Sequence, residues 1–400
     1  MSMNIISVKD YERYYGDIGL GNSYIDTLVF QRAISESNGR TLGIPAGTYY
    51  INETLLYQTD DPEAPGLTLF GEGMRNTTLV DNVIDGPLLR LQGGEGIDGH
   101  KQWGGRIADF SIVRGETREI GITSSGIVFR CVWHCDIERI RIQGLGGSGI
   151  HVMSHDRTGG GGDADSSAYL RFKNCWFGHN NDFGMRFESS PGTLGISQTS
   201  IEGCDITGNA LGGIRGVGVG IFTVRGCGIA ANGGRGTDCY GGVHVGYTDG
   251  ANSHHIVIEE CEIGNNNLPA SIWLETSIVG EISRNRFVKG AADHDRKGVY
   301  IGPSILPGHS TDGSVRELAC RQNWFGAYHK GKVPSTVPPT RSIVNTIPID
   351  SYTAFDVTGT ARNMYIEKTW WSPDFERFST FLKLNEETPG MVSWDQRPPP

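Results

Sequence analysis

The sequence predicts an all-β fold, a right-handed parallel β-helix with an N-terminal capping helix and an irregular C-terminal extension. One five-residue strand pattern recurs at intervals of 23 to 35 residues, with copies that start at Gly126, Gly149, Gly184, Gly213, Gly242, Ser271 and Gly298. In each copy, apolar residues alternate with residues expected to face outward, which is typical of a strand with one buried face. Short strands repeated at this interval, with no helix between copies, indicate a solenoid. Its coils would stack about 4.8 Å apart.

A second pattern supports the same register. Each coil also contains a segment of the form apolar-x-x-B-x-apolar, and position B holds Phe110, Ile140, Cys175, Cys204, Cys227, Cys261, Asn285 and Asn323. A buried cysteine behaves as a small apolar residue, and stacked asparagines can hydrogen-bond to one another. We therefore expect position B to form a ladder inside the core. A ladder spreads its members along an axis, so these cysteines predict neither a metal site nor a disulfide framework.

Composition narrows the classes of function. The chain has 400 residues and 58 glycines, yet a solenoid of this length forms one long domain. The net charge of −10 and the lack of a Lys/Arg-rich run argue against a nucleic-acid partner. No apolar stretch is long enough to predict a membrane span. The first residues show neither a basic nor an apolar segment of a secretory signal, so the sequence assigns no localisation.

We divide the chain into three parts. Residues 1–65 form an N-terminal part, in which apolar residues at helical spacing predict a helix over residues 26–38 with Asp26 as N-cap. Such a helix would cover the unpaired end of the solenoid. Residues 66–330 form the β-helix with its substrate groove. Residues 331–400 follow a proline-rich connection, contain three tryptophans, and are interpreted as a cap or an inter-subunit strap.

The N-terminal part also resembles a known family. The order Asp-Thr-x-x-Phe-Gln-x-Ala-Ile over residues 26–34 is followed by Gly-x-x-x-x-Ile-Pro-Ala-Gly-Thr-Tyr over residues 39–49. This order resembles the start of the pectate lyase-like (pectin lyase fold) superfamily, which includes phage tailspike-type and polysaccharide-degrading enzymes. The resemblance implies a parallel β-helix and a glycan substrate. Because slender β-helices of this superfamily often trimerise, it also implies a homo-oligomer, specifically a trimer.

Two outward columns of the repeated strand are candidates for the substrate groove. The first column contains Val128, His151, Arg186, Arg215, His244, Trp273 and Tyr300, and the second contains Arg130, Met153, Glu188, Val217, Gly246, Glu275 and Gly302. Aromatic rings can support sugars, arginine can hold carboxylates or hydroxyls, and carboxylates perform acid/base chemistry. We therefore expect substrate binding by Arg130, His151, Arg186, Arg215, His244, Trp273 and Tyr300. The alternative is a charge ladder that only keeps the strand soluble.

The leading candidate catalytic residues are four carboxylates, Glu188, Asp156, Asp163 and Glu275. Glu188 and Glu275 lie three coils apart, about 14 Å, which is too far for a glycosidase pair. We expect Glu188 to pair with Asp156 or Asp163 from the loop over residues 154–167, with Asp182 as another candidate. Glu275 would pair with Asp249.

The same loop bears on cofactors. Residues 163–165, Asp-Ala-Asp, resemble the opening of a calcium loop, but the later glycine and glutamate are missing. We therefore expect no cofactor, with calcium as the alternative.

Three functions follow from these residues. The leading hypothesis is an enzyme that hydrolyses glycosidic bonds of a polysaccharide or oligosaccharide with a carboxylate pair. The second is β-elimination or C5 epimerisation of a uronate-containing glycan, for which the cations would neutralise the uronate. The third is a solenoid that binds glycans, or serves a structural role, without catalysis.

Overall fold

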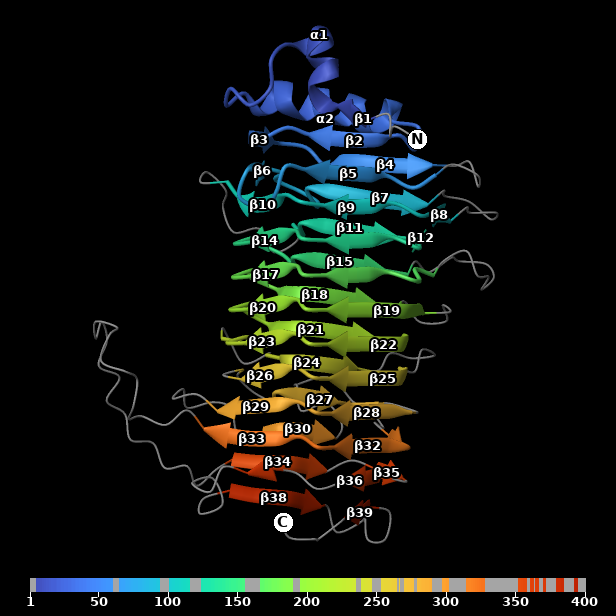
Figure 1. Ribbon diagram of the computed structural model, residues 1–400, viewed down its shortest axis with the longest axis vertical. Helices are drawn as coiled ribbons and strands as arrows, with labels where there is room; N and C mark the ends of the chain where they lie inside the picture. The colour runs from blue at the N-terminus through green and yellow to red at the C-terminus, as the bar shows by residue number, and fades with distance from the viewer. Residues whose placement is uncertain are drawn as a thin grey trace, which may run out of the picture.

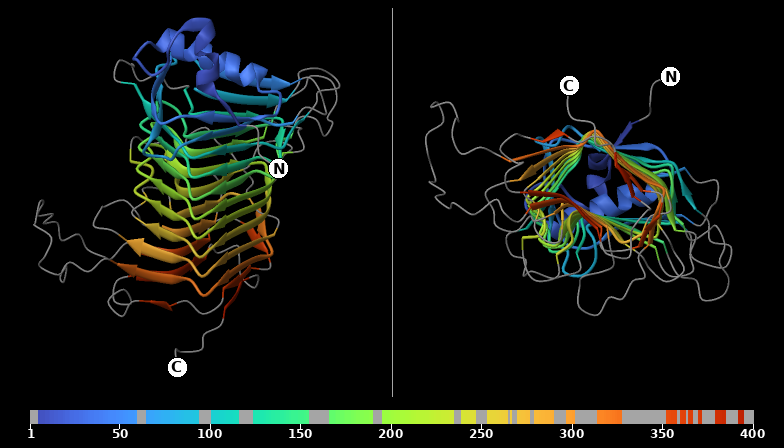
Figure 2. Two further views of the ribbon diagram at one scale, coloured as in Figure 1. Left: turned by 45° about the horizontal axis from the view of Figure 1, so that its top comes forward. Right: turned by 90° about the horizontal axis from the view of Figure 1, so that it is seen from below.

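The computed structural model confirms the predicted fold class (Figure 1). It describes residues 5–59, 65–93, 101–115, 124–154, 166–189, 195–234, 239–246, 253–264, 266, 270–276, 279–289, 297–301, 314–327, 352–357, 360–362, 364–366, 370–371, 379–384 and 392–394. Over these residues the strands of all three large sheets pair in parallel with the coil before and the coil after. Seen along its axis, the solenoid has three faces around one core (Figure 2).

Sheet A contains thirteen strands. They are β1 (Ile5–Ser7), β2 (Thr41–Ile44), β5 (Thr68–Gly71), β9 (Arg106–Ala108), β13 (Asp136–Glu138), β16 (Arg171–Lys173), β19 (Ile196–Glu202), β22 (Val219–Arg225), β25 (His254–Glu259), β28 (Gly280–Ser283), β32 (Leu318–Arg321), β36 (Met364–Ile366) and β39 (Val392–Trp394).

Sheet B contains eleven strands. They are β3 (Gly47–Ile51), β6 (Thr77–Asp81), β10 (Ser111–Arg114), β14 (Arg141–Gln143), β17 (Trp176–Gly178), β20 (Asp205–Thr207), β23 (Gly228–Ala230), β26 (Glu262–Gly264), β29 (Arg286–Lys289), β33 (Trp324–Ala327) and β37 (Trp370–Trp371).

Sheet C also contains eleven strands and includes the seven repeated copies. They are β4 (Leu55–Thr59), β7 (Leu89–Gly93), β11 (Ile127–Arg130), β15 (Ile150–Met153), β18 (Phe183–Glu188), β21 (Gly212–Val217), β24 (Gly241–Gly246), β27 (Ile272–Leu274), β30 (Lys297–Ile301), β34 (Tyr352–Val357) and β38 (Ser379–Leu384). Two short pairs, β8 (Gln102–Trp103) with β12 (Val132–Trp133) and β31 (Ser314–Arg316) with β35 (Thr360–Arg362), lie outside the large sheets.

The predicted register of the repeated strand is confirmed. Along sheet C, His151 pairs with Arg186, Arg186 with Arg215, Arg215 with His244, His244 with Trp273, and Trp273 with Tyr300. A slip of one residue in any coil would move its apolar residues to the outer face. The shared register therefore places the candidate residues in one outward row.

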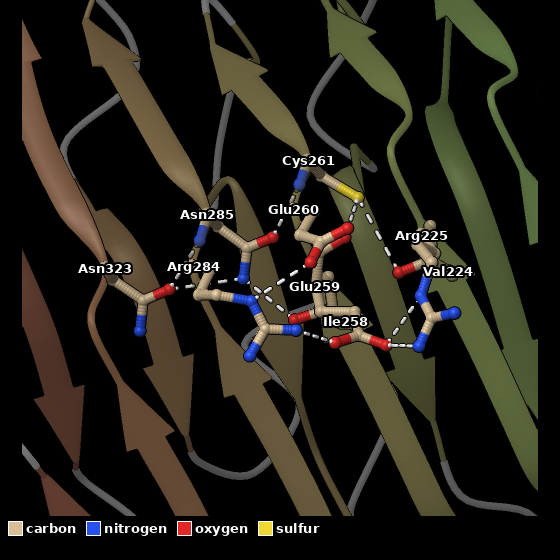
Figure 3. Close-up of polar contacts among 9 residues, drawn as sticks. All are labelled: Val224, Arg225, Ile258, Glu259, Glu260, Cys261, Arg284, Asn285 and Asn323. Carbon is tan, nitrogen blue, oxygen red and sulfur yellow. Dashed lines mark hydrogen bonds and ion pairs between the residues drawn. The ribbon is translucent and has the colours of Figure 1, made fainter.

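The ladder at position B is also confirmed, since all eight of its members are buried. The cysteine sulfurs point at carbonyl oxygens of the preceding coil, as in the 3.5 Å contact from Cys227 Sγ to Ile201 O. Where the ladder changes to asparagine, the Cys261 N–H donates to Asn285 Oδ1 at 3.0 Å, and the Asn285 N–H donates to Asn323 Oδ1 at 3.1 Å (Figure 3). The buried ladder at position B therefore continues without a break where cysteine is replaced by asparagine.

The capping helix is present, but its predicted N-cap is wrong. After η1 (Val8–Tyr11) and α1 (Glu12–Tyr15), helix α2 spans Ser23–Glu36 and lies across the end of the solenoid (Figure 1). The side chain of Asn22 caps it by accepting from the Ile25 N–H. Asp26 lies inside the first turn and is fully buried, where its carboxylate accepts the N–H groups of Gly19 and Tyr50. None of the helices among the described residues has the length and apolar character needed to cross a membrane.

The parallel sheets extend beyond both predicted boundaries of the β-helix. At the N-terminal end, β1 already pairs with β2, so coil pairing begins well before residue 66. At the other end, β34 and β38 continue sheet C, β36 and β39 continue sheet A, and β37 continues sheet B (Figure 1). The described parts of residues 331–400 are therefore further coils of the solenoid rather than a separate strap.

Candidate functional site

Glu188 lies at the centre of a charged cluster on the outer face of sheet C. One carboxylate oxygen lies 2.7 Å from the guanidinium group of Arg186 and 3.7 Å from His151 Nε2, and the other lies 3.1 Å from Arg215. Burial raises the pKa of Glu188, but the nearby His151 and the charges of Arg215 and Arg186 outweigh it and hold the pKa at about 2. Glu188 is therefore ionised at any ordinary pH.

A second carboxylate shares the same arginine. Arg186 Nη1 lies 3.2 Å from Asp182 Oδ2, and the Ser148 hydroxyl donates to that oxygen at 2.6 Å. Because one guanidinium group bridges Asp182 and Glu188, their nearest oxygens are at most about 8 Å apart, a limit compatible with the carboxyl separations of glycosidases. We refer to His151, Asp182, Arg186, Glu188 and Arg215 as the Glu188 cluster.

The Glu188 cluster is partly exposed. The side chains of His151, Glu188 and Arg186 are 16%, 24% and 30% exposed, respectively. The row continues towards the N-terminus through Val128 to Arg90 on β7, and Arg130 is partly exposed at the end of β11. Cations therefore extend over several neighbouring coils of this face.

The other end of the row is buried, which corrects the expectation that all seven positions are exposed. His244, Trp273 and Tyr300 are 2%, 0% and 2% exposed. They lie on the outer side of sheet C, but a second apolar cluster encloses this region, formed by Phe183, Leu211, Tyr240, Ala270, Trp273 and Tyr300. Trp273 is consequently part of an outer core and presents no open platform in this structure.

Glu275 lies with this buried end. Its carboxylate is 3.3 Å from His244 Nε2, and both side chains are almost fully buried. Glu275 and Glu188 thus belong to separate parts of the face, as their separation of three coils predicts. Catalysis at Glu275 would require the covering residues to move.

Tyr240 contacts both the Glu188 cluster and the buried end of the row, and the sequence pattern did not identify it. Its ring lies 4.6 Å from the Arg215 guanidinium carbon, 4.9 Å from the His244 ring and 6.0 Å from the Trp273 ring. Tyr240 precedes β24 and stands outside the repeated five-residue pattern, so counting columns could not find it. The sequence marks Tyr240 only by its position, as an aromatic residue directly before the two glycines that begin β24.

Several predicted residues lie outside the described part of the chain. These are Asp156 and Asp163, the candidate partners of Glu188, together with Asp165 of the possible calcium loop and Asp249. Within the described residues, no three His, Cys, Asp or Glu side chains are grouped to hold a metal ion.

Comparisons with known proteins agree with this architecture. The family model described as a right handed beta helix region matches residues 125–304. The match covers part of the chain, and with the solved structures it shows that the chain has a right-handed parallel β-helix fold. No curated protein matches its sequence.

Solved structures with the same fold have very different sequences. The Dettilon tailspike protein is 12% identical with a TM-score of 0.59, over 95% of this chain and 68% of that one. The endo-xylogalacturonan hydrolase of Aspergillus tubingensis is 10% identical with a TM-score of 0.59, over 98% and 99%. The mannuronan C-5 epimerase A-module of Azotobacter vinelandii is 12% identical with a TM-score of 0.56, over 97% and 99%. This chain spans only 62% to 68% of the viral and tailspike proteins that it matches.

Proposed function

We propose that this β-helix is an enzyme that binds a polysaccharide or oligosaccharide on the outer face of sheet C and hydrolyses glycosidic bonds at the Glu188 cluster. The observation that supports this most is the ionised Glu188 carboxylate, partly exposed between His151, Arg186 and Arg215. An anionic carboxylate that is fixed in place and partly exposed is suited to attack a sugar.

In this proposal Glu188 is the nucleophile. Its pKa of about 2 leaves no proton for a leaving group, so it is not the general acid. The acid is a second carboxylic acid, for which the candidates are Asp156 and Asp163, since Asp182 is paired with the same arginine as Glu188. Arg186 and Arg215 orient the carboxylate and contact sugar hydroxyls or carboxylates through their planar groups.

The comparisons support a glycan as substrate through the fold alone. The similar structures include a hydrolase and an epimerase named for polysaccharide substrates, and a tailspike. One fold hosts several chemistries, so the reaction is argued from the cluster itself.

A screen for new reducing ends tests the proposal. The full chain is incubated with glycans that include neutral and uronate-containing polymers, and each is compared with the same digestion by the Glu188→Gln variant. We expect products with the wild type and a loss of products with the variant. Glu202→Gln is the matched control, since Glu202 lies on sheet A beside Lys173 at 3.6 Å. Absence of product on every glycan would favour a binding solenoid.

A second candidate is elimination or C5 epimerisation at a uronate. The number of cations favours it: Arg186 and Arg215 lie beside Glu188, and Arg130 and Arg90 lie two and three coils away on the same face of sheet C, where they would neutralise carboxylates along a uronate chain. Ultraviolet absorbance of an unsaturated uronate would identify elimination. A change in C5 configuration without chain cleavage, seen by NMR, would identify epimerisation.

A further inference from the structure

Four aromatic side chains form an exposed surface beside the proposed groove. They are Trp103 on β8, Trp133 on β12, and His134 and Tyr169, which follow on the same and the next coil. We call this set the aromatic shelf. In Figure 1 β8 and β12 lie at the carboxyl ends of β7 and β11, at the edge of sheet C. None of these four residues belongs to the repeated strand pattern.

The rings pack against one another in an ordered stack. His134 lies between two rings: its centroid is 5.3 Å from that of Trp103 and 4.2 Å from that of Tyr169, with interplanar angles of 18° and 9°. Trp133 packs at 5.1 Å from Trp103 and 5.7 Å from Tyr169. Its indole N–H donates to Ser166 O at 2.8 Å, which fixes the orientation of the ring. The shelf is therefore preorganised.

Unlike the Trp273 end of the row, this aromatic cluster remains at the surface. Trp103 is 42% exposed, His134 is exposed, and Trp133 and Tyr169 are half-buried. The Lys101 ammonium group lies 3.7 Å from the Trp133 ring. The surface thus combines a flat apolar ring with polar groups at its border, the combination expected for a ligand that has one apolar face and a polar edge.

The shelf lies at the edge of sheet C at which Glu188 ends β18. Arg130 pairs with Met153, and Met153 with Glu188, so the coil that contains Trp133 is two coils from Glu188. That separation is about 10 Å along the axis, and Trp103 lies one coil further. A glycan of several sugars is long enough to span this axial separation.

We infer that the aromatic shelf is a second glycan-binding site, at which a sugar ring of the substrate packs its apolar face against Trp103. The inference rests on the proposed function. It assigns to the shelf the role of binding the glycan at a point distant from the bond that reacts. Four side chains are too few for a stable protein interface, which buries about 800 Å² per partner. The net charge of −10 disfavours nucleic acid.

Affinity electrophoresis of the full chain tests the shelf. Gels contain polygalacturonate, mannuronan, xylan or dextran, and each protein also carries Glu188→Gln so that the polymer is not cleaved. We expect at least one polymer to retard the chain and Trp103→Ala to weaken that binding about three- to tenfold, the range for loss of one aromatic contact. Trp103→Phe should restore most of it, because the ring is retained.

Trp176→Ala is the matched control. Trp176 lies on sheet B, partly buried, with the Arg141 guanidinium 4.4 Å from its ring, so this variant removes a similar tryptophan from another face. It should bind as tightly as its parent. The inference is overturned if Trp103→Ala also binds like its parent, if none of the four polymers retards the chain, or if Trp103→Ala only lowers the molar mass in light scattering. Weaker binding by Trp103→Ala together with full activity of Glu188→Gln would support the shelf and reject the catalytic role of Glu188.

Discussion

At the scale of single residues, Glu188 shows how charge rather than burial sets the state of a catalytic candidate. Burial alone would raise the pKa of its carboxyl group, yet the group is held at about 2 by His151, Arg215 and Arg186. The cluster therefore supplies a permanent anion on a face that is otherwise rich in cations. An enzyme that needs an anionic nucleophile over a wide pH range can use such a group.

The depressed pKa of Glu188 predicts how stability depends on pH. Because its folded pKa of about 2 lies below the ordinary value of 4.5, the group stabilises the folded state above pH 4.5 and loses that contribution as pH falls towards 2. The contribution is at most about 3 kcal/mol. Urea unfolding between pH 5 and pH 2.5 should show a steeper loss of stability for the wild type than for Glu188→Gln. Equal slopes for the two proteins would mean that the pKa of Glu188 is not depressed.

The sequence predicted the neighbours of Glu188 because the strand pleat and the parallel register dictate them. His151, Arg186 and Arg215 fall in adjacent coils whenever the repeat is aligned on its apolar positions. The burial of Trp273 could not be predicted in this way. The side chains that cover it, among them Phe183, Leu211 and Tyr240, come from turns and from positions outside the pattern. Alternation tells which side of a sheet a residue faces, and it does not tell whether another layer covers that side.

At the scale of the elements, Asp26 joins the capping helix to the first coil. It lies in α2, and its two oxygens accept from the Gly19 N–H at 2.9 Å and from the Tyr50 N–H of β3 at 2.7 Å. The sequence suggested a cap because aspartate often precedes a helix. In this chain Asn22 performs that role, and the helix begins three residues earlier than expected.

Substitution of these two residues should have unequal effects. Asp26→Ala leaves two buried N–H donors without an acceptor and should lower the free energy of unfolding by more than about 2 kcal/mol. Asn22→Ala removes an exposed cap and should cost about 1 kcal/mol. Thermal and urea unfolding of both variants measures the difference. A smaller effect for Asp26→Ala than for Asn22→Ala would show that the buried carboxylate does not hold the helix on the solenoid.

At the scale of the whole molecule, pairing of strands from β1 to β39 makes one continuous solenoid. Each coil contacts the coils before and after it, so the two ends depend on what covers them. Helix α2 covers one end. Strands beyond residue 331 continue the three sheets. Truncation at residue 331 would therefore remove coils and expose new strand edges.

The resemblance to the pectin lyase fold superfamily predicts assembly into a trimer. Light scattering of the full chain should give about three times the chain mass of 43.5 kDa. The measurement needs several protein concentrations, because a weak trimer dissociates on dilution. A mass of one chain at all concentrations would contradict the prediction.

The central claim is that Glu188 performs the chemistry of the face formed by sheet C. Single-turnover kinetics on a cleaved glycan, with Glu188→Gln beside Glu275→Gln and the control Glu202→Gln, test it most directly. We predict that Glu188→Gln slows the chemical step by about 10²-fold or more with little change in substrate affinity, while Glu202→Gln leaves it unchanged. Full activity of Glu188→Gln, with activity lost in Glu275→Gln, would contradict the claim and move the catalytic centre to the buried pair of Glu275 and His244.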